Sequence, residues 1–484
     1  MKWHINIAWM LMVSMMALIT SCSKTYLNQN PQSALTTASF YATGSDAEAG
    51  LIASYDALQQ EYYQWDFITN GDARADNCYA GGDNPNNFQI DNFQVTPLNT
   101  NIDRDWTQLY VGIMRANAVL DNINKIDTTT FSSPQRKQQI IGEAKFLRAM
   151  HYFRLVRDFG GVPLVLTINT TDIYTPRSTA EEVYAQIERD LMDAEAALPA
   201  TFGSAAETHG RATQGAAEAL LAKAYAQQLK YDSCLIYCTK VTSSPVYALL
   251  PNFEDLWTGQ NENNSESIFE IQYESANGEG NFGIQLMTPQ ILTGDEWIKF
   301  NIPTHNLIDT FRAEGDSVRL HSSVIFQVTT NVPSPYRPGD NVPYIYKWRH
   351  PNGWNSPDNV MLMRLADIIL LQAEALNALG RTAEAIPLVN QIRNRVKLPN
   401  TTATTQADMK EAILSERRLE LAFEGERWYD LLRAGAPYTI QVMQSQQNGS
   451  GANMGYNINE NELLFPIPQR EISLNNNVTQ NQGY

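Results

Sequence analysis

One segment of the chain, residues 140–164, constrains the fold more than any other, because its apolar residues are too numerous for one face of a helix. Along 140–159 they recur at helical spacing in two neighbouring rows. These rows consist of Ile140, Ala144, Phe146, Leu147, Ala149, Met150, Tyr152, Phe153, Val156 and Phe159. A helix that is apolar around most of its circumference packs on more than one side. We therefore predict a central helix that ends at Gly160-Gly161.

The narrow polar strip of this helix carries Arg148, His151 and Arg154, with Asp158 one turn beyond Arg154. On a central helix we expect such charges to pair internally, because an unpaired buried charge is costly. The segment is interpreted as a scaffold rather than as a site of chemistry.

The N-terminus predicts export. A short basic start is followed by an apolar run over 5–20 that is too short to span a membrane comfortably. The run ends in the letters LITS immediately before Cys22, which resembles a bacterial lipobox. That resemblance implies that residues 1–21 are a lipoprotein signal peptide and that Cys22 is lipidated. An ordinary cleaved signal followed by a chance cysteine is the alternative.

The composition of the chain limits the classes of ligand and partner that it can bind. The formal net charge of −17 and the lack of any Lys/Arg run argue against nucleic acid. Cys234 and Cys238 are four residues apart on one face of a predicted helix, and no His or acidic residue lies at ligand spacing near them. We interpret them as small apolar residues rather than as a disulfide or metal pair. We predict no metal site and no cofactor.

Helical periodicity divides the rest of the chain. It predicts helices over 46–63, 106–126, 179–198, 213–228, about 231–241, 370–393 and 405–434. The segments 216–241 and 370–393 resemble tetratricopeptide-type helix pairs. Residues 64–100 are rich in Asn, Asp, Gly and aromatics without periodicity, which predicts a long loop. Residues 244–358 have a similar composition, with short strand-like runs at 267–273 and 323–329.

Several motifs together resemble the SusD/RagB family of outer-membrane lipoproteins of Bacteroidetes. In chain order they are NQNPQSALTTASFYATGSDAEAGLIASYDAL, AKFLRAMHYFRLVRDFGGVPLV, RATQGAAEALLAKAYAQ, MRLADIILLQAEALN, NQIRNRVKLP, SERRLELAFEGERWYDLLR, LLFPIPQREI and TQNQGY. The chain departs from the family at Gln482, where the family usually has Pro, and at Asn477, where Asn-Pro is common.

The resemblance implies one mainly α-helical domain over 22–484, with short strands in its irregular half. Its tetratricopeptide-like helices would cover about 46–243 and 360–434, with a variable loop-rich insert over about 244–358 and an irregular C-terminal tail. It also implies an anchor in the outer membrane, facing outside, and a SusC-like TonB-dependent transporter as partner. Many members bind a polysaccharide or oligosaccharide, and none is known as an enzyme.

The densest charge lies in residues 415–433, which we interpret as a structural ion-pair network, together with Arg364. A glycosidase would instead need two carboxylates that face each other across a sugar. The chain contains no Gly-x-Ser-x-Gly, His-Glu-x-x-His, Walker or EF-hand motif. We therefore predict no catalytic residues.

Aromatic residues in the two irregular regions are the better functional signal. Sugar rings stack their C–H faces on aromatic rings, and Asp, Asn and Arg bond to the hydroxyls. The candidate ligand-binding residues are Trp65, Asp72, Arg74, Asp76, Asn77, Tyr79, Trp297, Tyr344, Trp348 and Trp354. The alternative is that these aromatics form local cores.

Our main hypothesis is a cell-surface lipoprotein that binds a glycan and passes it to a SusC-like transporter. The first alternative is a transporter lid for a non-glycan nutrient such as peptides, with no glycan site of its own. The second is a surface glycosidase.

Overall fold

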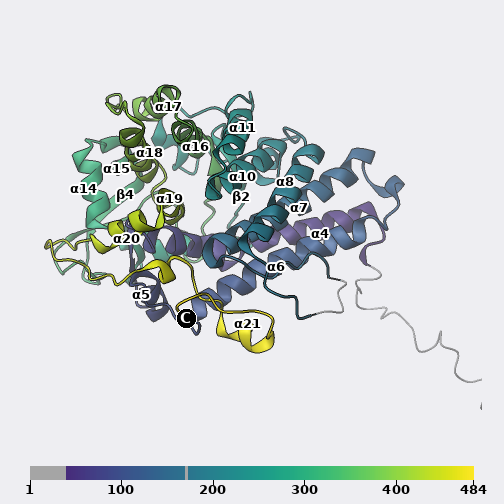
Figure 1. Cartoon of the computed structure of the whole chain (residues 1–484), viewed down its shortest axis with the longest axis horizontal. Coiled ribbons are helices and arrows are strands. Elements are labelled where there is room, and N and C mark those ends of the chain that lie inside the picture. Colours follow the sequence, from purple (N-terminus) through teal and green to yellow (C-terminus); the bar gives the residue numbers. More distant parts are fainter. Residues whose placement is uncertain (1–39, 169–172) are drawn as a thin grey trace, which may run out of the picture.

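The computed structural model describes residues 40–168 and 173–484, so the predicted signal peptide and Cys22 lie outside the described residues. Helices dominate the molecule and the strands are short, which confirms the mainly α-helical prediction (Figure 1). The insert helices α14 (His305–Ala313) and α15 (Ser317–Ser323) lie at one end of the molecule. Among the described residues, no helix is both long and apolar enough to cross a bilayer.

The helices pack side by side as a continuous stack. Its N-terminal members are α4 (Gly44–Asp56), α6 (Thr100–Ile123), α7 (Pro134–Phe159), α8 (Ala180–Ala197), α10 (Gln214–Gln227) and α11 (Tyr231–Thr242). The short α9 (Ala205–Gly210) lies between α8 and α10 in the chain. Its C-terminal members are α16 (Leu365–Ala378), α17 (Thr382–Arg395), α18 (Gln406–Glu420), α19 (Arg427–Ala434) and α20 (Ala436–Gln444). Because α11 packs directly on α16, the two helical regions join across the insert.

The central helix is confirmed as α7, which packs on both α6 and α8. It ends at Gly160, whose φ of 74° suits a residue without a Cβ atom. Two residues of its polar strip, Arg148 and Asp158, have internal partners, as expected. Arg148 makes two bonds to the carboxylate of Asp190 (2.8 and 2.7 Å), and Asp158 accepts a bond from the hydroxyl of Tyr429 (2.6 Å).

The prediction of a long loop over 64–100 is wrong. This region holds the π-helical segments η2 (Tyr62–Asp66) and η3 (Thr69–Ala73), strand β1 (Cys78–Gly81) and α5 (Pro85–Asp91). The residues that broke the periodicity have capping and pairing roles. Asn84 and Asn99 cap the N-termini of α5 and α6, so short elements follow one another without an apolar repeat.

The insert combines short helices with antiparallel strand pairs. In the described chain the pairs are β1 with β3 (Phe300–Pro303), β2 (Ser267–Ile271) with β6 (Val360–Arg364), and β4 (Val324–Val328) with β5 (Asn341–Ile345). Strands β2 and β4 confirm the two strand-like runs. The short helices α12 (Gly283–Met287) and α13 (Gln290–Thr293) precede β3.

The charged segment 415–433 forms a structural network, as expected. Arg364 at the end of β6 donates to Glu420 of α18 (2.6 Å) and to Glu266 (3.0 Å), and all three side chains are buried. The network therefore ties the insert to the helical stack. Cys234 and Cys238 are buried free thiols 3.8 Å apart in α11, in keeping with their interpretation as small apolar residues.

The C-terminal tail, which contains α21 (Gln469–Leu474), is held against the end of α7. The amide of Asn481 donates to the carbonyl oxygens of Phe159 (3.0 Å) and Phe465 (2.7 Å). Asn477 donates to the carbonyl of Tyr174 (3.0 Å), so this departure from the family pattern still fixes the tail.

Candidate functional site

The ten candidate residues fall into two groups by exposure. Eight are buried: Trp65, Asp72, Arg74, Asp76, Asn77, Tyr79, Tyr344 and Trp348. Trp297 and Trp354 have 52% and 53% of their surface exposed. The structure therefore brings two of the ten to the surface, and both lie in the insert.

The polar candidates near the N-terminus bond to one another and to the helical stack. Asp72 accepts from the amide of Asn77 (2.7 Å) and from the backbone N–H of Gly425 (2.7 Å). The guanidinium of Arg74 lies 3.6 Å from the centre of the Phe465 ring. These side chains lie in the interior, where a sugar at the surface cannot reach them, so we interpret these residues as structural.

The buried aromatic candidates pack in the interior against residues of the insert. Trp65 packs against Phe300 of β3, with ring centres 5.3 Å apart. Trp348 donates its indole N–H to the carbonyl of Asn359 (3.3 Å). Tyr344 belongs to a small cluster with Ile302 of the neighbouring strand. For these three residues the local-core alternative describes the structure.

Trp297 and Trp354 form an exposed aromatic pair. Their ring centres are 6.3 Å apart and their planes are 83° apart, an edge-to-face arrangement. The two residues are 57 positions apart in the sequence and lie in the loops between α13 and β3 and before β6. Tertiary packing alone creates the pair, hereafter called the tryptophan pair.

The loop that carries Trp297 is anchored by a buried lysine. The ammonium of Lys299 donates to the carboxylate of Asp295 (2.6 Å) and to the carbonyl of Gln285 (3.0 Å). The same carboxylate accepts the backbone N–H of Trp297 (3.0 Å). Burial lowers the pKa of Lys299, but the adjacent carboxylate opposes this effect. The ion pair between Lys299 and Asp295 thus fixes the position of the Trp297 backbone.

The loop that carries Trp354 is held by the residues that follow it. The side chain of Asn355 accepts the N–H of Gly280 (2.7 Å) and donates to the carbonyl of Ser275 (2.6 Å). Ser356 and Asn281 exchange backbone hydrogen bonds of 3.1 and 2.8 Å. These bonds order the loop in advance. The entropic cost of ordering it when a ligand binds is therefore smaller.

Sequence reasoning missed the residues that position the tryptophan pair: Asp295, Lys299, Asn355 and Gly280. A signal for one loop was present in PNGWNSPDN, residues 351–359, where turn-forming residues surround a tryptophan. A tryptophan in such a setting belongs to no periodic apolar row. Nothing in the sequence indicates the pairing across 57 residues.

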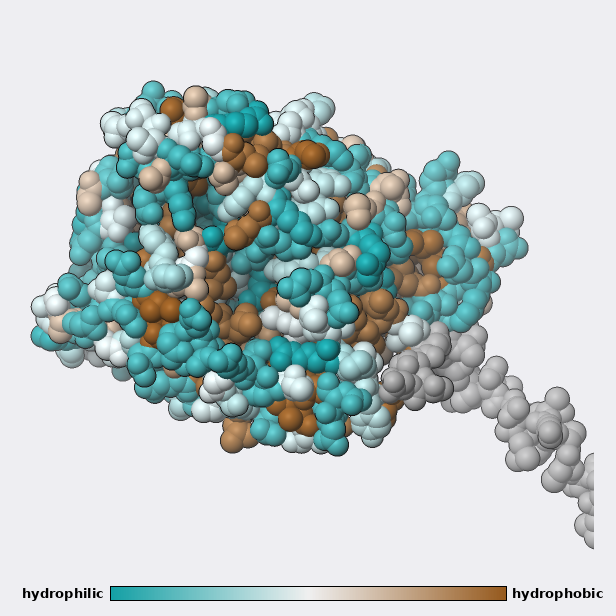
Figure 2. All heavy atoms as spheres, viewed as in Figure 1, coloured by the Kyte–Doolittle hydropathy of each residue, from teal (hydrophilic) through white to brown (hydrophobic). Residues whose placement is uncertain are grey.

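The molecular surface around the stack is mostly hydrophilic, with hydrophobic residues in small separate groups on the face shown (Figure 2). The exposed acids Glu274, Glu279 and Glu296 lie in the two loops that carry or anchor the tryptophan pair. The surface near the pair is therefore acidic as well as aromatic.

Comparisons with known proteins agree with this architecture. A family model described as the SusD family matches residues 316–484, and one described as starch-binding associating with outer membrane matches residues 25–226. SusD-like protein P38 of Formosa agariphila is 30% identical over 99% of both chains.

Solved structures show the same likeness in the fold. A laminarin-binding SusD-like protein has 29% sequence identity and a TM-score of 0.76, over 92% of this chain and 100% of its own. Surface glycan-binding protein A of Bacteroides uniformis has 25% identity and a TM-score of 0.77, over 91% of this chain and 99% of its own. The helical stack, the family motifs and these likenesses together show that the chain belongs to the SusD family.

Proposed function

We propose that this protein is a lipid-anchored protein of the outer-membrane surface that binds a glycan on the tryptophan pair and passes it to a SusC-like TonB-dependent transporter. Cys22 would carry the anchor. Membership of the SusD family supports the proposal, as do the laminarin-binding and glycan-binding proteins of similar structure. The observation that carries it is the exposed, anchored tryptophan pair.

The geometry of the pair suits sugar rings. Each indole offers a flat apolar face on which the C–H groups of a pyranose can stack. Because the two planes are 83° apart, the pair presents two surfaces to a chain that bends between neighbouring sugars. Affinity for a short oligosaccharide rests on stacking and is therefore modest, and a long chain gains by offering repeated binding positions.

The charges around the pair select the class of glycan. Glu274, Glu279 and Glu296 would repel a uronate or a sulfate ester, and the nearby Lys299 is buried in its bond to Asp295. The site therefore favours a neutral polysaccharide.

The protein would act by binding rather than by catalysis. The carboxylates of the charged segment, which were the best candidates for an acid pair, are bound to arginines in the interior. Glu416 and Glu420 both accept bonds from the buried guanidinium of Arg319 (2.7 and 3.2 Å). A sugar at the surface cannot reach them.

The helical stack offers the broad, stiff surface that we expect on the side facing the transporter.

Affinity electrophoresis of the protein without residues 1–22, through gels that contain neutral and acidic polysaccharides, tests the glycan site. We expect one or more neutral glycans to retard the protein. The substitutions Trp297→Ala and Trp354→Ala should each weaken binding about tenfold, or roughly 1.4 kcal/mol, and together abolish retardation.

Ile236→Ala is the matched control, because Ile236 is 58% exposed on α11, away from the insert. It should leave retardation unchanged, and all variants should keep the melting temperature of the parent protein. If no polysaccharide retards the protein, glycan binding is rejected in favour of a lid for a non-glycan nutrient. Co-purification of the transporter with the anchored protein tests the transfer step separately.

A further inference from the structure

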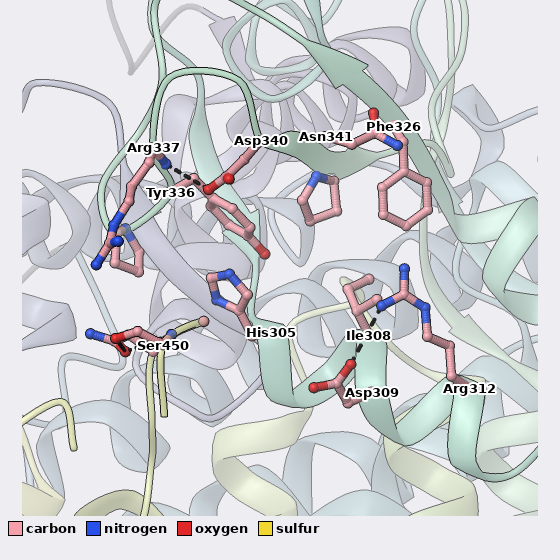
Figure 3. Close-up of a pocket in the computed structure, with 14 residues that line it drawn as sticks. His305, Ile308, Asp309, Arg312, Phe326, Tyr336, Arg337, Asp340, Asn341 and Ser450 are labelled. Carbon is pink, nitrogen blue, oxygen red and sulfur yellow. Dashed lines mark hydrogen bonds and ion pairs between the residues drawn. The ribbon is translucent and has the colours of Figure 1, made fainter. Parts of the chain in front are cut away.

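We propose a second saccharide-binding site at the edge of the insert, a pocket that takes a neutral sugar unit and is separate from the tryptophan pair. The pocket has a volume of about 310 Å³ and lies between the start of α14, strand β4, residues 335–343 and residues 448–450 (Figure 3). This volume is near the lower limit of roughly 300–1,000 Å³ for small-molecule sites, which suits about one or two sugar rings.

The pocket has a rigid aromatic wall. The rings of His305 and Tyr336 are stacked, with centres 4.2 Å apart and planes 25° apart. Tyr336 donates its hydroxyl to the carbonyl of Pro303 (2.8 Å), and Nδ1 of His305 bonds to the hydroxyl of the buried Tyr79 (3.0 Å). Phe326 of β4 adds a further ring to the lining. These bonds hold a flat surface in place before any ligand arrives.

The polar groups of the pocket combine donors and acceptors. Arg312 and Arg337 lie on opposite sides of His305, and each has an aspartate near it in the lining (Figure 3). Asp340 accepts the backbone N–H of Arg337 (2.8 Å), and Asp309 lies 3.4 Å from the guanidinium of Arg312. Within the described chain, the guanidinium of Arg337 makes no hydrogen bond or ion pair, so its donors are free for a ligand.

This combination identifies the class of ligand. Two guanidiniums and two carboxylates leave the lining without net formal charge, so an anion meets Asp309 and Asp340 and a cation meets Arg312 and Arg337. A hydroxyl group, by contrast, accepts from arginine and donates to aspartate at the same time. A neutral molecule with many hydroxyls and an apolar C–H face satisfies both the charged rim and the aromatic wall.

The connection between β4 and β5 borders both the pocket and the tryptophan pair. In this connection, Asn331 donates to the carbonyl of Glu296 (2.5 Å), the residue before Trp297. Tyr336, in the same connection, donates to the carbonyl of Pro303 and lines the pocket. Trp297 and His305 are only eight residues apart, at most roughly 26 Å even in an extended chain. A long glycan can therefore occupy both sites and gain affinity from the second contact. The ligand class rests on the proposed function, but the pocket itself does not.

Two signals measured in one titration distinguish the two sites. The protein without residues 1–22 is labelled with ¹³C at the ε1 carbon of histidine, and the signal of His305 is assigned with the variant His305→Asn. Neutral oligosaccharides of gluco, galacto and manno configuration are added at constant pH while indole fluorescence is followed. We expect a saturable shift of the His305 signal, both in the parent protein and in the double variant Trp297→Ala/Trp354→Ala.

Pocket variants complete the test. Arg312→Gln with Asp340→Asn should weaken the response of His305 at least tenfold without changing the melting temperature. The same types of change in the exposed α17 pair, Arg381→Gln with Glu384→Gln, should leave it unaltered. A long neutral glycan should bind the pocket variant at least threefold more weakly than the parent protein.

Each other result has a defined meaning. A fluorescence change without a shift of His305 rejects the pocket and keeps the tryptophan pair. A shift of His305 without a fluorescence change keeps the pocket and rejects the pair, and no response in either signal rejects both. If the shift disappears in the double tryptophan variant, it was transmitted from the pair and the pocket is rejected. A stronger response to acidic than to neutral oligosaccharides rejects the proposed ligand class.

Discussion

At the scale of single residues, Asp72 and Asp76 show how the surroundings decide the behaviour of a buried carboxyl group. Burial raises the pKa of Asp72 to about 7, although the N–H groups around it stabilise the charged form. For Asp76, burial alone would raise the pKa, but the guanidiniums of Arg418 and Arg427 outweigh it and lower the pKa to about 2. Both roles are structural, and a sequence pattern of spaced Asp and Arg residues does not separate them from a sugar site.

The substitution Asp76→Asn should destabilise the protein by about 3–5 kcal/mol, because it leaves two buried guanidiniums without their carboxylate. It should also change the pH dependence of stability. The folded pKa of Asp76 lies below the unfolded value of 3.8, so the unfolded state takes up a proton first on acidification. The parent protein therefore loses this stabilisation between about pH 4 and pH 2, and the variant has none to lose.

Urea unfolding between pH 2 and pH 7, followed by circular dichroism, measures both effects. The control is Asp193→Asn, the same chemical change at an exposed carboxylate paired with Lys145, and it should alter stability by less than about 0.5 kcal/mol. Equal losses in the two variants would contradict the structural role assigned to Asp76.

At the scale of elements, the contact between α6 and α7 depends on one glycine. A Cβ atom built at Gly112 of α6 would lie 2.1 Å from Nε2 of His151 in α7. The ring has little freedom to move, because Nδ1 of His151 bonds to the hydroxyl of Tyr63 (3.1 Å). Burial lowers the pKa of His151 to about 3, so the ring is neutral in the core at ordinary pH. The same histidine therefore links α7 to the π-helical segment η2, which contains Tyr63.

The substitution Gly112→Ala should therefore destabilise the protein by about 1–2 kcal/mol, even though alanine favours a helix by roughly 1 kcal/mol over glycine. Gly142→Ala in α7 is the matched control, since its Cβ would meet only side-chain atoms of Ala197 and Leu198, at 3.0–3.2 Å. We expect that variant to be close to neutral. The measurement is the shift in melting temperature of both variants, and a stabilised Gly112→Ala would overturn the proposed contact.

At the scale of the whole molecule, acidic charge is both an overall property and a local one. The chain has a formal net charge of −17, and the exposed acids Glu274, Glu279 and Glu296 lie in the loops around the tryptophan pair. The net charge and the local glutamates therefore both repel an anionic polysaccharide. Stacking on the indoles does not depend on salt, whereas this repulsion does.

A carboxymethylated derivative of the neutral glycan that binds should bind at least tenfold more weakly than its parent at low ionic strength, and the difference should shrink as salt is added. The double variant Glu274→Gln/Glu279→Gln should also reduce the difference while leaving the affinity for the neutral glycan unchanged. Affinity electrophoresis at two salt concentrations makes the measurement. Tighter binding of the carboxymethylated form would contradict the neutral-glycan proposal.

Much of the fold follows from local patterns, and the exceptions have a common cause. Periodicity identified α7 and both α16 and α17, because each has an apolar face that repeats along one helix. It failed over 64–100, where short elements are held by contacts such as that between Asn70 and Asp105 (2.9 Å). Bonds between residues of different elements leave no repeat in the sequence.

The sequence by itself determined the family and the mainly helical stack, because motifs and apolar repeats are properties of neighbouring residues. The tertiary structure decided which candidates reach the surface. It buried Trp65 and Trp348 as supports of the insert and brought Trp297 and Trp354 together across 57 residues. Exposure and pairing depend on how distant segments pack, and an aromatic residue in an irregular region looks the same in the sequence whether it forms a core or a platform.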